Sequence, residues 1–88
     1  MKWKSGVTIE KDGGFFLCMG EKNRQLEEED ISIAELIESG ITDDEELTAK
    51  VAEYFGENEL MADFRLAQFV ADYGEFIAQA SQSRVFEI

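Results

Sequence analysis

The stretch of residues 6–26 constrains the fold most strongly, because it predicts a small antiparallel sheet. Residues 7–10 and 15–19 are rich in the apolar and aromatic side chains typical of strands, and residues 24–26 predict a short third strand. Between the first two strands, residues 11–14 supply the glycines that a tight turn with positive φ requires. Such a ribbon leaves unpaired edges, and the remainder of the chain has to cover one of its faces.

The alternation of side chains along the strands separates an inner from an outer face. The side chains expected to face the core are Val7, Ile9, Phe15, Leu17 and Met19. Phe16 and Cys18 fall on the outer face, beside Thr8. No His, Lys or helix N-terminus adjoins Cys18 in the sequence to activate its thiol, so we interpret it as a small packing residue rather than a nucleophile.

Helices are expected throughout the chain after the meander. A capping box at residues 32–35 places the start of the first helix, although a start at Glu28 also fits, and Gly40 ends this helix. A second capping box at residues 42–45 opens the next helix, which ends at Gly56. The side chains of this helix that are expected to share one buried face are Leu47, Val51, Tyr54 and Phe55.

The longest helix is expected to begin at Asn58 or Glu59 and to continue to about Ala80. Its core-facing stripe comprises Ala62, Leu66, Phe69, Val70, Tyr73, Phe76, Ile77 and Ala80. Three further apolar residues lie off this stripe, namely Leu60, Met61 and Phe64. They either pack beneath the sheet edge or the amino-terminal arm, or they form a contact surface.

With 88 residues the chain is expected to form one domain over residues 1–80, followed by a C-terminal tail of residues 81–88. In that tail, residues 85–88 add a strand, bind a partner or fray. Trp3 is expected to pack on the end of the sheet. The expected fold class is therefore α+β, with an N-terminal three-stranded antiparallel meander followed by a three-helix, winged-helix-like bundle.

The net charge excludes several classes of partner. Twenty acidic residues against eight basic ones give a formal charge of −12. Nucleic acids and anionic membranes both require a basic surface, so neither is an expected partner. The charge suits a basic protein partner, or it serves solubility alone. One cysteine precludes an internal disulfide, and no segment has the pattern of a membrane span or a signal peptide, so a cytoplasmic location is expected.

The residues that most catalytic and metal sites need are missing from the sequence. There is no histidine, no second cysteine, and no glycine-rich phosphate loop. The turn at Asp12 and Gly13 lacks the alternating oxygen ligands of a calcium loop. We therefore expect no catalytic activity, no metal and no cofactor.

The order of these elements resembles that of the PqqD-like family, the precursor-peptide recognition elements of ribosomal peptide natural product pathways. The resemblance extends over about residues 7–77. It is carried by Leu26 at the end of the third strand, by residues 33–42 with their Gly and Thr, by residues 45–47, and by the aromatic-Gly stop at residues 54–56. The sequence departs from the family pattern at Glu27, which replaces an asparagine, at Arg65, which replaces an acid, and at Ile77, which replaces a glycine.

This resemblance implies a stand-alone adaptor that binds the leader region of a precursor peptide. The leader is expected to add as a strand along residues 23–27 and to pack against the last helix. The residues implied to line this site are Asn23, Arg24, Gln25, Leu26, Glu27, Met61, Arg65, Leu66 and Phe69. The adaptor, a monomer or weak dimer, would present the precursor to a separate modifying enzyme, such as a radical S-adenosylmethionine enzyme.

Two other functions compete with this adaptor hypothesis. An acidic interaction module or inhibitor would cover a basic partner surface, but this requires acids on one face, whereas here they are spread over the caps and all three helices. A winged-helix transcription factor fits the order of elements and conflicts with the negative charge.

Overall fold

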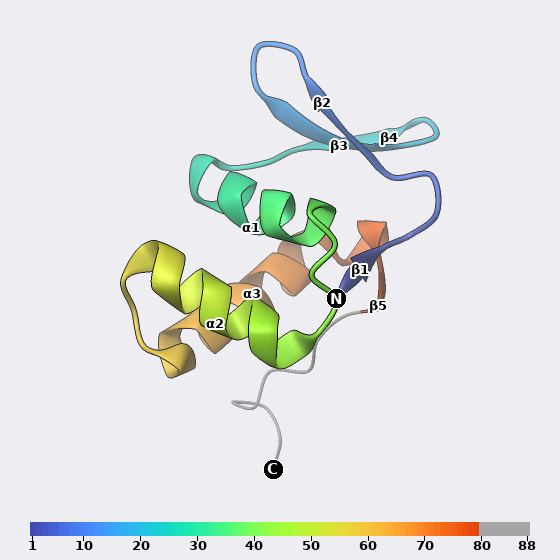
Figure 1. Ribbon diagram of the computed structural model, residues 1–88. Coiled ribbons are helices and arrows are strands. Elements are labelled where there is room, and N and C mark those ends of the chain that lie inside the picture. Colours follow the sequence, from blue (N-terminus) through green and yellow to red (C-terminus); the bar gives the residue numbers. More distant parts are fainter. Residues whose placement is uncertain (80–88) are drawn as a thin grey trace.

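The computed structural model of the chain describes residues 1–79 and has an α+β fold (Figure 1). A three-stranded antiparallel sheet contains β2 (Thr8–Lys11), β3 (Phe15–Met19) and β4 (Lys22–Gln25) in that spatial order. Three helices follow, namely α1 (Glu28–Glu38), α2 (Asp44–Phe55) and α3 (Glu59–Tyr73). The expected fold class, a meander that precedes three helices, is confirmed.

The register of the meander confirms the predicted faces. Ile9 lies opposite Leu17, and Thr8 lies opposite Cys18. Because directly opposite residues share a face, the first pair points toward the core and the second points away from it. The third strand begins at Lys22 rather than at Arg24, because Gly20, with φ of 63°, reverses the chain directly after β3.

Helix α1 lies between the sheet on one side and α2 and α3 on the other (Figure 1). Each layer contributes fully buried side chains to one core. Those that are at most 1% exposed include Leu17, Ile33, Leu47, Val51, Phe69 and Phe76. The sheet is therefore held to the helices by its inner face, while its edges and outer face stay open.

The N-terminus of α1 differs from the main prediction. The helix begins at Glu28, so the earlier of the two expected starts is correct and the capping box at residues 32–35 is wrong. Ser32 lies inside the helix, where its hydroxyl donates to the carbonyl oxygen of Glu29 at 3.4 Å. The first turn holds Glu28, Glu29 and Asp30, and the helix dipole favours acids at this end.

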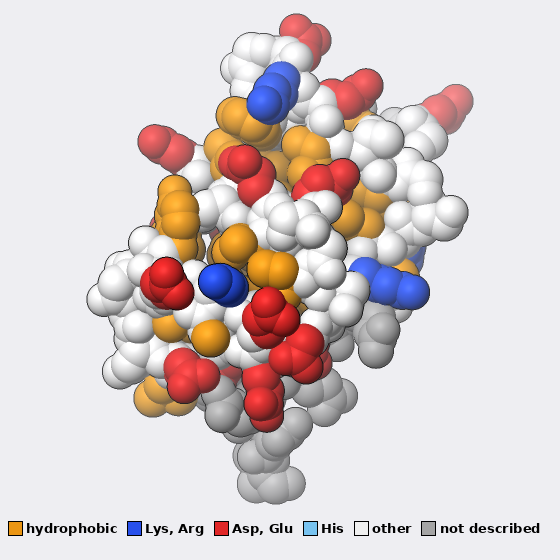
Figure 2. All heavy atoms as spheres, viewed as in Figure 1, with side chains coloured by type: hydrophobic (Ala, Val, Ile, Leu, Met, Phe, Trp, Pro, Cys, Tyr) orange, Lys and Arg blue, Asp and Glu red, His pale blue; other side chains and the backbone are white. Residues whose placement is uncertain are grey.

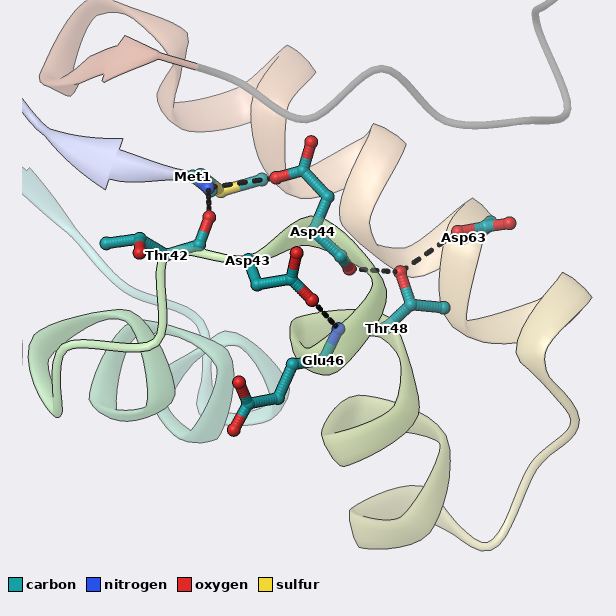
Figure 3. Close-up of polar contacts among 7 residues, drawn as sticks. All are labelled: Met1, Thr42, Asp43, Asp44, Glu46, Thr48 and Asp63. Carbon is teal, nitrogen blue, oxygen red and sulfur yellow. Dashed lines mark hydrogen bonds and ion pairs between the residues drawn. The ribbon is translucent and has the colours of Figure 1, made fainter.

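Helix α2 is capped by Asp43 instead of Thr42. The carboxylate of Asp43 accepts a hydrogen bond from the backbone nitrogen of Glu46 at 2.9 Å (Figure 3). The carbonyl oxygen of Thr42 accepts instead from the backbone nitrogen of Met1 at 3.1 Å. Tyr54, expected in the core, is 66% exposed, because the buried face of α2 extends toward Thr48 and Ala52 and leaves Tyr54 at its margin.

A buried hydrogen bond joins α2 to α3. The hydroxyl of Thr48 donates to the Oδ1 atom of Asp63 over 3.2 Å, and Asp63 is only 6% exposed (Figure 3). At the ends of these helices, Gly56 closes α2 with φ of 65°, and the side chain of Asn58 caps α3 by accepting from the backbone nitrogen of Met61. Both of these boundaries agree with the sequence prediction.

The last helix is shorter than predicted. It ends at Tyr73 and is followed by a 3₁₀ turn, Gly74–Phe76, and by β5 (Ile77–Gln79), which pairs antiparallel with β1 (Lys2–Trp3). Phe76 and Ile77 are buried as expected, but Phe76 lies in the 3₁₀ turn and Ile77 in β5 rather than in the α-helix. Glycine is a poor helix former, and Gly74 marks the change. Ala80 and the strand-like segment of residues 85–88 lie outside the described residues.

Trp3, expected on the end of the sheet, packs against helix α3. Its ring is half-buried and lies 6.1 Å from the ring centre of Phe69. No helix within residues 1–79 combines the length and the apolar character that crossing a membrane requires.

Candidate peptide-binding site

Strand β4 has a free edge. Among the described strands it pairs with β3 alone, and all four of its residues are exposed. The backbone nitrogen of Leu26 donates to the carbonyl oxygen of Phe15 at 2.8 Å, in the register that pairs Arg24 with Leu17. Hydrogen-bonded residues alternate along an antiparallel strand, so the backbone groups of Asn23 and Gln25 point away from β3. These two residues form the open edge.

Tyr73 closes this edge at its carboxyl end. Its hydroxyl accepts a hydrogen bond from the backbone nitrogen of Glu27 at 3.2 Å and donates one to the Oδ2 atom of Asp30 at 2.9 Å. The guanidinium of Arg24 lies 5.2 Å from the centre of the same ring. The last turn of α3 therefore fixes the junction between β4 and α1, and the open edge ends at Gln25.

Burial and neighbouring charge shift two pKa values at this junction. Burial raises the pKa of Tyr73 to about 12, and the carboxylate of Asp30, which accepts a hydrogen bond from the Tyr73 hydroxyl, acts in the same direction. The pKa of Asp30 is also raised, first by burial and further by the charges of Glu27, Glu29 and Asp72, while the hydrogen bond from Tyr73 opposes the rise. Asp30 is thus an acid surrounded by other acids.

A groove of about 120 Å³ lies between the start of α1 and one face of α3. Its lining consists of Glu27, Glu29, Asp30, Ile33, Arg65, Gln68 and Asp72. The three residues from α3 are spaced three and four positions apart, which places them on a single helix face. The groove lies close to the open edge of β4 along the chain, because Glu27 of its lining comes two residues after Gln25, the last residue of that strand.

Arg65 is the one cation in the lining, and its charge is already compensated. Its Nε atom donates to the carboxylate of Glu57, and its Nη1 atom lies 3.4 Å from Glu29. The guanidinium also stacks 4.0 Å from the ring centre of Phe55. The hydrogen bond to Glu57 is the main reason that the pKa of Arg65 is raised. Arg65 therefore behaves as a fixed part of the groove wall.

The residues predicted to line the site fall into two groups. The first group lies toward the surface: Asn23, Arg24 and Gln25 on β4, Glu27 at the junction of β4 and α1, and Met61 and Arg65 on the α3 face that continues the groove. The other three belong to the core, with exposed fractions of 4% for Leu26, 3% for Leu66 and 0% for Phe69. These buried side chains support the walls and do not line the groove.

The sequence prediction missed several residues of this site. Glu29, Asp30, Gln68 and Asp72 line the groove, and Tyr73 anchors its end. Placing the start of α1 at Glu28 would have put the first two acids in the first helical turn. The spacing from Arg65 would have identified Gln68 and Asp72, but only the packing of α3 against α1 determines that this face borders β4.

The outer face of the sheet carries a second, shallower hollow of about 240 Å³. It is lined by Glu10, Asp12, Phe16, Cys18 and Asn23. The thiol of Cys18 donates to the Oε2 atom of Glu10 at 2.8 Å, and this hydrogen bond to a carboxylate raises the thiol pKa. A thiol with a raised pKa is a weaker nucleophile at neutral pH, which agrees with its interpretation as a packing residue.

The first turns of α3 expose an apolar patch. Leu60, Met61 and Phe64 are 57%, 47% and 45% exposed, so they do not pack beneath the sheet edge.

Acidic side chains are spread over the sheet and the helices on the face seen in Figure 2, with few Lys or Arg side chains among them. Within residues 1–79, no group of three or more His, Cys, Asp or Glu side chains is arranged to hold a metal ion.

Comparison of the chain with protein-family models, with curated proteins and with solved structures finds no match. The relationship to the PqqD-like family therefore stays a hypothesis. It is based on the order of the elements and on the site described above.

Proposed function

We propose that this protein is a stand-alone adaptor that binds the leader region of a precursor peptide by adding it as a strand to β4. One observation carries the proposal: the open backbone edge at Asn23 and Gln25 adjoins a groove between α1 and α3. An edge provides hydrogen bonds with little demand on sequence, and a neighbouring groove provides side-chain recognition. Together they are the two elements that strand addition requires.

In this proposal the peptide pairs with the N–H and C=O groups of Asn23 and Gln25. The pairing ends at Glu27, because its amide nitrogen is already bonded to Tyr73. Alternate side chains of the peptide face the groove, beside Arg24, and the remaining ones face the outer side of the sheet. A disordered leader loses conformational entropy on pairing, so we expect moderate affinity.

The adaptor itself performs no chemistry in this proposal and needs no cofactor. It holds the leader, and the rest of the precursor extends to a separate modifying enzyme, for which a radical S-adenosylmethionine enzyme is the choice that the family resemblance suggests. The protein then acts in the cytoplasm, where the precursor is made. The competing function is an acidic module that covers the basic surface of a folded partner.

Peptide selection followed by amide exchange tests the proposal. Short random peptides are displayed and selected on the immobilised full chain, and hydrogen exchange of the labelled protein is then measured with and without a selected peptide. We expect slower exchange at Asn23 and Gln25, with unchanged exchange at Ile9 and Lys11 on the opposite edge. Failure to select any peptide, or slower exchange confined to β2, would contradict strand addition at β4 and favour the acidic module.

A further inference from the structure

The charges around the groove do not balance. The lining contains four carboxylates, from Glu27, Glu29, Asp30 and Asp72, and one guanidinium. That guanidinium, from Arg65, pairs with Glu29 and with a fifth carboxylate, that of Glu57. The lining therefore retains a net negative charge even after its own cation is counted.

Three of these carboxylates have no cationic partner in the described part of the chain. No Lys or Arg of residues 1–79 forms an ion pair with Glu27, Asp30 or Asp72. Asp30 accepts from the hydroxyl of Tyr73, and Asp72 accepts from the amide of Gln68 at 3.1 Å, so both are held in place by neutral donors. Positioned carboxylates without cations attract a cationic ligand.

We expect the cation to be part of a peptide rather than a free metal ion. The described residues contain no converging set of three metal-ligating side chains. The groove instead lies near the end of the open β4 edge, since Glu27 of its lining comes two residues after Gln25, and such an edge pairs with extended backbone. A long basic side chain also suits the lining, because its flexible stem lets the charged end reach the acids.

We propose that the peptide bound on β4 is basic, with Lys or Arg at positions i and i+2 directed into the groove toward Glu27, Asp30 and Asp72. This inference rests on the proposed function and adds to it the chemical class of the peptide. The spacing follows from the alternation of side chains along a strand, which sends every second residue to the same face. Since Arg24 lies on that face, the peptide position directly opposite it is neutral or acidic, because like charges in directly opposite positions repel. The two basic positions are therefore the next two on that face, in the direction of Glu27.

The test uses the peptides selected on the full chain. We expect Lys and Arg to be enriched at i and i+2, and we expect these peptides to slow amide exchange at Asn23 and Gln25. A peptide of the same composition with its bases at i and i+1 sends one of them to the wrong face, and should bind about two- to fivefold more weakly.

Protein variants test the groove separately from the edge. The double variant Glu27→Gln and Asp72→Asn should weaken a basic peptide by about tenfold. The matched control is Glu35→Gln with Glu38→Gln, which makes the same change in net charge on exposed α1 residues outside the lining, and it should weaken binding by less than about twofold.

The outcomes separate this inference from the proposed function. Selected peptides that slow exchange at Asn23 and Gln25 without enrichment of Lys or Arg overturn the inference and leave strand addition standing. Equal losses in the groove and control variants also overturn it, because they attribute the effect to overall charge. If basic peptides bind without any change in exchange along β4, the proposed function is overturned and the inference with it.

Discussion

Strands β2 and β4 each expose one backbone edge of the same sheet, and the two edges differ in what continues them. On β2, the backbone nitrogen of Asp12 donates to the carbonyl oxygen of Gly14, which shows which residues of the strand are hydrogen-bonded to β3. Because hydrogen-bonded residues alternate along an antiparallel strand, the backbone N–H and C=O groups of Ile9 and Lys11 point away from β3. The chain preceding β2 closes in a turn, in which the Val7 nitrogen donates to Lys4. The β4 edge instead leads into a helix and adjoins the acidic groove.

The two edges therefore offer the same backbone hydrogen-bonding groups but differ in the neighbouring surface that would recognise the side chains of a peptide. Both edges offer unpaired N–H and C=O groups, and both carry a lysine, Lys11 on β2 and Lys22 on β4, a residue type that protects sheet edges from unwanted pairing. The Lys11 ammonium lies 5.3 Å from the ring centre of Phe15, so it stays beside the sheet. At β4 the same backbone chemistry is combined with fixed carboxylates. We infer that an open edge binds a peptide when a structured surface lies beside it. Variants of β2, β4 and their neighbours test whether only the β4 edge meets this condition.

The largest effect is expected from proline on the β4 edge. Gln25→Pro removes an outward N–H without removing a bond to β3, and its ring occupies the place of the peptide backbone. We expect selected peptides to bind about thirtyfold more weakly, measured by calorimetry. Lys11→Pro makes the matched change on β2 and should leave binding intact. Equal losses, with both variants folded by circular dichroism, would remove the distinction between the edges.

A smaller effect is expected from the tyrosine that closes the β4 edge. Tyr73→Phe removes the acceptor for the Glu27 nitrogen and the donor to Asp30, both at a buried position. We expect the free energy of unfolding to fall by about 1–2 kcal/mol in urea titrations. Tyr54→Phe, at a ring that is 66% exposed, serves as the control and should have little effect.

The same tyrosine predicts a loss of stability in alkali. Its pKa is raised to about 12 in the folded protein, from an ordinary value of 10.0. The folded chain therefore holds this proton more tightly than the unfolded chain, and the resulting stability is present below pH 10 and disappears as the pH rises toward 12. Urea titrations across this interval should give a steeper decline for the natural chain than for Tyr73→Phe. Parallel declines would show that other groups control alkaline unfolding.

The smallest effect is expected from Asp30→Asn. Because the pKa of Asp30 is raised, its contribution to stability is greatest below its ordinary value of 3.8 and is lost as the pH rises through the folded value. Asparagine keeps an oxygen that accepts from Tyr73 and does not titrate. The variant should therefore gain stability relative to the natural chain between acid and neutral pH. Glu35→Gln is the control, and an equal gain there would point to net charge alone.

The parts of the fold that were predicted correctly depend on local signals. The meander follows from its turn glycines and alternating side chains, and the boundary at residues 56–58 follows from a glycine stop and an asparagine cap. The start of α1 was ambiguous, because Ser32 and Glu35 imitate a capping box inside the helix. The end of α3 was misplaced, since Phe76 and Ile77 keep helical spacing although the α-helix has already changed to a 3₁₀ turn and then to β5.

The site was only partly predictable for a different reason. The edge at Asn23 and Gln25 is a property of one strand, and it can be expected from the order of the elements. The groove depends on which face of α3 is turned toward the start of α1. That orientation is set by the buried contacts of Leu66 and Phe69, so these residues were taken for lining when they are its support.

The pairing of β1 with β5 has a consequence for the order of folding. It joins Trp3 to Ile77, so it can form only after the intervening chain has been brought together. Contacts between residues so far apart in sequence are slow to form, because the entropy of closing the loop is lost first. Trp3 is the single tryptophan and packs on Phe69. Its fluorescence therefore reports the pairing of β1 with β5. A change in fluorescence that follows the helical circular dichroism signal during refolding would show that this pairing is a late step of folding.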